Sequence, residues 1–69
     1  MSLKELGMEY LRQSEAIKNK IKQLREESKN MKPKQLYNLR GRLLALYSDA
    51  ASLKTIGEYL ISYYGEENE

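Results

Sequence analysis

Apolar and small residues recur at alternating steps of three and four along two long stretches of the chain, on either side of its only proline. In the first stretch these positions are Leu3, Gly7, Tyr10, Ser14, Ile17, Ile21, Leu24, Ser28 and Met31. In the second they are Leu36, Leu39, Leu43, Leu46, Ala50, Leu53, Gly57, Leu60 and Tyr64. Steps of three and four keep residues on one face of an α-helix. The pattern therefore predicts two amphipathic helices, at about residues 3–30 and 33–64.

Local signals mark the ends of both helices. Ser2 followed by Glu5 is a helix-capping pattern, since the serine hydroxyl can accept the amide of the third helical residue. Pro33 disfavours a helical residue before it and suits the first position of a new helix, and Asn30 can supply a left-handed stop. Gly65 offers a C-terminal cap. We therefore expect a single domain over residues 1–65 and a frayed acidic tail over residues 66–69.

Antiparallel pairing of the two stripes about a turn at residues 30–33 matches residues by size. Gly7 falls opposite Gly57 and Ser14 falls opposite Ala50, while large apolar residues face one another elsewhere. One continuous helix with a kink at the proline is the alternative, but it gives no reason for this matching. The sequence thus predicts an all-α, antiparallel two-helix hairpin.

The second helix carries a further stripe without a single ionic residue. Its members are Tyr37, Gly41, Leu44, Ser48, Ala51 and Thr55. A lone hairpin should expose charge along its whole outer side, and small residues at helical spacing let another helix come close. We expect this stripe to be the interface of a homodimer that forms a four-helix bundle. A helix of a different protein is the alternative occupant, and a tetramer stays open.

Charge is unevenly distributed along the chain despite a net value of only +2. Residues 18–42 have a net charge of +7, whereas residues 1–17 and 43–69 have −1 and −4. The hairpin therefore gathers positive charge at its turn. Candidate contacts for an anion or nucleic acid are Lys18, Lys22, Arg25, Lys29, Lys32, Lys34, Arg40 and Arg42. The competing interpretation, which we favour slightly, is a solvated basic end that steers hairpins into an antiparallel dimer.

Residue types exclude most catalytic chemistry. The chain has no cysteine and no histidine, so disulfides, thiolate or histidine metal sites and histidine bases cannot form. No serine has a base partner by spacing, and the carboxylates fall on a solvated helix or in the tail. We expect a non-enzyme without cofactor or metal. The sequence also lacks a membrane-spanning apolar run and a secretion signal, which predicts a cytoplasmic protein without membrane insertion.

The segment from Ile56 to Gly65, IGEYLISYYG, follows a leucine-rich helix opened by Lys32 and Pro33. In this second half the chain resembles short uncharacterised helical proteins of Gram-positive phages and mobile elements. The resemblance includes no catalytic motif, and it implies a small accessory or regulatory protein. We expect a protein-interaction or structural adaptor, with a nucleic-acid-binding regulator as the less favoured alternative.

Overall fold

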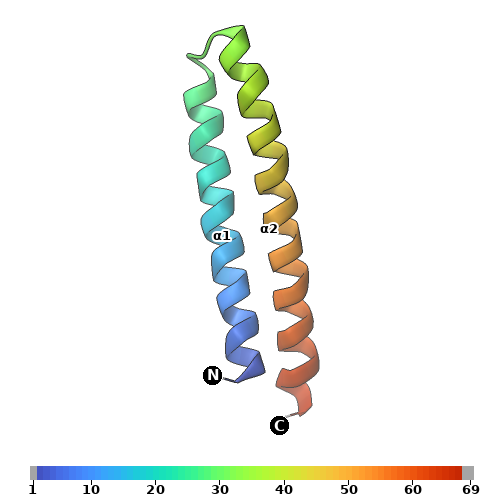
Figure 1. Cartoon of the computed structure of the whole chain (residues 1–69). Helices are drawn as coiled ribbons and strands as arrows, with labels where there is room; N and C mark the ends of the chain where they lie inside the picture. Colours follow the sequence, from blue (N-terminus) through green and yellow to red (C-terminus); the bar gives the residue numbers. More distant parts are fainter. Residues whose placement is uncertain (1, 68–69) are drawn as a thin grey trace.

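The chain folds into two long helices joined by a short turn, in a computed structural model that describes residues 2–67 and the side chains of residues 2–63. Helix α1 (Leu3–Ser28) and helix α2 (Pro33–Glu67) lie side by side in a rod measuring 53 × 15 × 15 Å. The turn is at one end of the rod, and both chain ends are at the other (Figure 1). The predicted antiparallel hairpin is confirmed, and the alternative of one kinked helix is wrong.

Helix α1 starts as predicted and ends slightly earlier. The amide of Glu5 donates to the side-chain oxygen of Ser2 over 3.0 Å, so the serine caps the helix. At the other end, the amide of Asn30 donates to the carbonyl of Glu27 over 3.2 Å. No described residue has a positive φ, so the prediction of a left-handed stop at Asn30 is wrong. The last carbonyls of α1 instead accept hydrogen bonds from amides three residues further along the chain.

Helix α2 begins at Pro33, as predicted. The amide of Lys32 donates to the side-chain carbonyl oxygen of Gln35 over 3.0 Å, which caps the new helix from within its first turn. At the far end, α2 runs to Glu67, so the prediction of a cap at Gly65 is wrong. Glycine can also adopt helical angles, and here it does. Of the predicted frayed tail, residues 68–69 lie outside the described residues.

The core is a single seam between the helices, and its residues belong to the two predicted stripes. Among the described residues, those buried in this seam are Gly7, Ser14, Ile21, Leu24, Leu39, Ala50 and Gly57. The first residue of each stripe is not buried by the other helix. Leu3 and Leu36 are 46% and 41% exposed. A two-helix rod has no third element there to cover them.

The helices approach each other closely near the open end. A Cβ atom added to Gly7 would lie 2.9 Å from the backbone oxygen of Gly57, and one added to Gly57 would lie 2.8 Å from that of Gly7. About two helical turns further inward, the hydroxyl of Ser14 donates to the carbonyl oxygen of Ala50 over 2.8 Å. Only small residues allow backbones this close. These contacts therefore fix the register of the hairpin.

Replacing Gly7 with alanine is expected to destabilise the fold. Alanine favours a helix by about 1 kcal/mol over glycine, but here its methyl group would push against backbone that cannot give way. We expect Gly7→Ala to lower the free energy of unfolding by about 1–3 kcal/mol in urea titrations. Asn19→Ala, on the exposed side of α1, is the control and should raise it slightly. Equal effects of the two changes would contradict the close approach.

Candidate functional site

The first candidate surface is the side of α2 that faces away from α1. All six residues of the predicted interface stripe are exposed in the single chain. Tyr37 and Leu44 expose 79% and 62% of their surface, and a Cβ atom built on Gly41 meets no atom within 4 Å. The rotation of the helix thus turns the stripe outward, as the sequence predicts. The single chain therefore leaves the stripe uncovered.

The outer face continues as an apolar surface toward the end of α2. Ile56 and Tyr59 are 46% and 58% exposed, and the ring of Tyr59 stacks on that of Tyr63 with centroids 5.6 Å apart. A shallow hollow of about 330 Å³ is lined by Ala51, Ser52, Thr55 and Ile56. Small residues with larger apolar neighbours form a surface on which another helix can pack.

The charged residues of α2 lie beside the outer face and not on it. At 100° per residue, Arg40, Lys54 and Glu58 fall on one flank, and Arg42 and Asp49 fall on the other. Between the first turn of α2 and Tyr63, the outer face therefore has no charged side chain. This uncharged outer face is what distinguishes α2 from a solvated helix.

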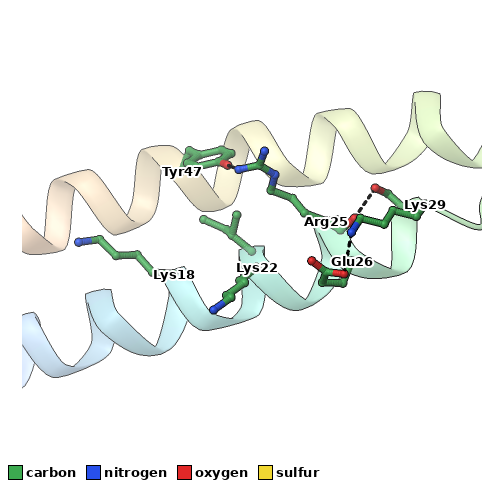
Figure 2. Close-up of a pocket in the computed structure, with 8 residues that line it drawn as sticks. Lys18, Lys22, Arg25, Glu26, Lys29 and Tyr47 are labelled. Atoms are coloured by element: carbon green, nitrogen blue, oxygen red, sulfur yellow. Dashed lines mark hydrogen bonds and ion pairs between the residues drawn. The ribbon is translucent and has the colours of Figure 1, made fainter.

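The second candidate surface is a groove of about 660 Å³ on one flank, near the turn. Its lining residues are Lys18, Ile21, Lys22, Arg25, Glu26, Ser28, Lys29 and Tyr47. The four basic residues come from one side of α1, where their spacing of four, three and four places them in a row (Figure 2). The basic groove thus contains four of the eight residues predicted to contact an anion.

Arg25 is held across the basic groove by Tyr47, a partner that the sequence did not reveal. The Arg25 guanidinium donates to the Tyr47 hydroxyl over 3.3 Å, from α1 to α2 (Figure 2). Side chains lean toward the N-terminus of their helix, and in an antiparallel pair this tilts the two residues toward each other. Matching residues that lie directly opposite each other in the two stripes does not predict this diagonal contact.

Two lysines of the basic groove are partly neutralised within α1. Lys18 pairs with Glu15 at 3.7 Å, and Lys29 pairs with Glu26 at 3.1 Å. Lys22 and Arg25 have no carboxylate partner among the described residues. The positive charge that the groove offers to an anion therefore comes mainly from these two.

The other four predicted basic contacts are not part of the groove. Arg40 lines a neighbouring hollow of about 320 Å³, together with several leucines and Tyr47. Lys32 and Lys34 are exposed at the turn, and Arg42 is exposed on the opposite flank of α2. The structure thus divides the predicted basic set between the groove, the turn and the far flank.

Neither a carboxylate cluster for a metal nor a membrane-spanning helix is found in the part of the chain that the structure describes. Within residues 2–67, no three carboxylates lie close enough together to hold a metal ion. In the same part of the chain, neither helix combines the length and apolarity needed to cross a bilayer.

Comparisons with protein-family models, with curated proteins and with solved structures found no match. The resemblance to hairpin proteins of phages and mobile elements stays a prediction.

Proposed function

We propose that the protein is a non-catalytic adaptor that works as a homodimer, with two hairpins joined through the uncharged outer faces of their α2 helices. The observation that supports this proposal is the exposure of a long apolar face on the helix side where a solvated rod should be charged. Such a dimer is a four-helix bundle with α2 inside and the charged α1 outside. We also propose that it acts in the cytoplasm.

Association also supplies the burial that one hairpin lacks. In a single chain the core is one seam, and a chain of 69 residues buries too little apolar surface to be comfortably stable. Burying a leucine or aromatic side chain fully contributes about 1.5–3 kcal/mol. Tyr37 and Leu44 are available on each copy for this purpose.

The second candidate function is binding of a nucleic acid backbone in the basic groove. Lys22 and Arg25 are the observation that favours it, because neither has a carboxylate partner among the described residues. Arginine and lysine bind phosphate by charge and by hydrogen bonds, independently of base sequence. The neutralisation of Lys18 and Lys29 within α1 makes this the weaker candidate.

Leu44→Glu is expected to break the dimer without unfolding the hairpin. The change places a carboxylate in the proposed interface, where burial of a charge is strongly unfavourable, while Leu44 is 62% exposed in the single chain. Sedimentation velocity at micromolar concentration should give a dimer for the wild type and a monomer for Leu44→Glu.

Asn19→Glu provides the matched control for that experiment. It adds the same charge to the exposed side of α1, far from the proposed interface, and should leave the dimer intact. A monomeric wild type, or a Leu44→Glu protein that associates as the wild type does, would overturn the proposed function.

Lys22→Glu tests the second candidate. If the basic groove binds duplex DNA, affinity should fall steeply with salt, and this charge reversal should weaken binding at least tenfold at low salt. Lys20→Glu makes the same change outside the groove and should weaken binding far less. Fluorescence anisotropy across a salt series measures both. Absence of binding at low salt, or equal losses in the two variants, would rule out the groove as a nucleic-acid site.

A further inference from the structure

The hairpin places like charges beside like charges. The basic part of α1, residues 18–29, lies along the basic start of α2, because both adjoin the turn. The start of α1, where residues 1–17 have a net charge of −1, lies along the acidic end of α2 at the open end. The rod, 53 Å long, is therefore positive at one end and negative at the other, and folding of the single chain does not relieve this separation.

Helix α2 also carries its charges against its own macrodipole. Residues 33–42 contain three basic residues and no acidic one, whereas residues 58–67 contain three acidic residues and no basic one. The N-terminus of a helix favours anions and the C-terminus favours cations, so this order is unfavourable in an isolated helix. Helix α1 has the usual order, with Glu5 in its first turn and Arg25 in its last.

Among residues 2–63, no charged side chain of α2 has an ionic partner. The ion pairs of these residues all lie in α1 and its C-terminal cap Lys29, as in Arg12 with Glu9. Arg40 and Glu58 lie on the same flank of α2, but 18 positions apart in the sequence, which is about 27 Å along the helix. The two side chains are therefore too far apart to pair within one hairpin, and both are exposed to a partner from outside it.

We propose that the occupant of the outer face of α2 is a second copy lying antiparallel, so that Arg40 of each copy pairs with Glu58 of the other. This inference rests on the proposed self-association and specifies its topology. A two-fold axis near Asp49 brings the turn end of each rod beside the open end of its partner. In this arrangement the positive end of each rod lies beside the negative end of the other. The basic start of each α2 then lies beside the acidic end of the second copy's α2.

The same register fits the shapes along the outer face. When Arg40 faces the second copy's Glu58, Ser48 of one copy meets Ala51 of the other at the centre of the interface. Leu44 then lies beside Thr55 of the second copy. The centre of α2, which spans residues 33–67, is residue 50, so nearly the whole of both helices overlaps. A parallel dimer would instead place both positive ends together.

A charge-swap experiment tests the pairing. Arg40→Glu and Glu58→Arg should each raise the dimer dissociation constant roughly tenfold, since each change creates two repulsive contacts in a two-fold dimer. The double variant Arg40→Glu/Glu58→Arg restores opposite charges and should associate nearly as well as the wild type. Sedimentation equilibrium at low salt measures all four proteins.

The outcomes separate this inference from the proposed function. A wild type that remains monomeric removes the proposed function itself. A wild-type dimer whose double variant is no better than the single variants, or whose single variants associate unchanged, overturns the antiparallel register while the proposed function survives.

A distance measurement on an otherwise unchanged chain decides the topology even where the charge variants fold poorly. The protein has no cysteine, so Lys34→Cys gives one attachment point for a nitroxide, on an exposed residue at the turn end. Double electron–electron resonance should give roughly 45 Å between the two labels of an antiparallel dimer, from the helical rise. A distance below about 25 Å would show two turn ends side by side and overturn the inference.

Discussion

The close contact between the two helix backbones near the open end determines most of what this chain presents to its surroundings. The backbones of Gly7 and Gly57 are almost in contact. About two turns closer to the hairpin turn, the hydroxyl of Ser14 donates to the carbonyl of Ala50. These contacts set both the register of the hairpin and the rotation of α2 about its axis. Since that rotation points the small and aromatic stripe outward, the packing inside the hairpin also decides which surface is left for a partner.

Packing and electrostatics both favour the proposed association of two hairpins. A hairpin held together by one narrow seam gains stability if a second surface is buried, and the outer face of α2 is apolar enough to be buried. The separation of charge between turn and open end then gives the association a preferred orientation. The basic groove beside Tyr47 adjoins the flank of α2 that carries Arg40, and Tyr47 lines both this groove and the hollow next to Arg40 and Leu44.

The sequence predicted the hairpin and its seam because helical periodicity and residue size carry that information directly. The pairing of Gly7 with Gly57 follows from two regular stripes and one proline, and so does the burial of Ser14. The prediction was wrong at Asn30 and Gly65, because both residues can adopt ordinary helical or turn angles as well as the left-handed ones expected of a cap.

The candidate surfaces were predictable only in part. The outward position of the uncharged stripe follows from the same periodicity, and so does the row of basic residues on α1. The cap from Gln35 and the bond from Arg25 to Tyr47 depend on where long side chains reach, which spacing alone does not determine. Ion pairs such as Lys29 with Glu26, which lower the charge of the basic groove, depend on side-chain conformation in the same way.

The central claim is that the outer face of α2 is covered in the working protein, and solvent access to that face tests it most directly. Because the chain has no cysteine, Ser48→Cys places a single thiol on this face with little change in size. The rate of alkylation under reducing conditions should fall as protein concentration rises into the micromolar range, while Asn19→Cys on α1 keeps a constant rate. A Ser48→Cys thiol that reacts equally fast at every concentration would contradict the account.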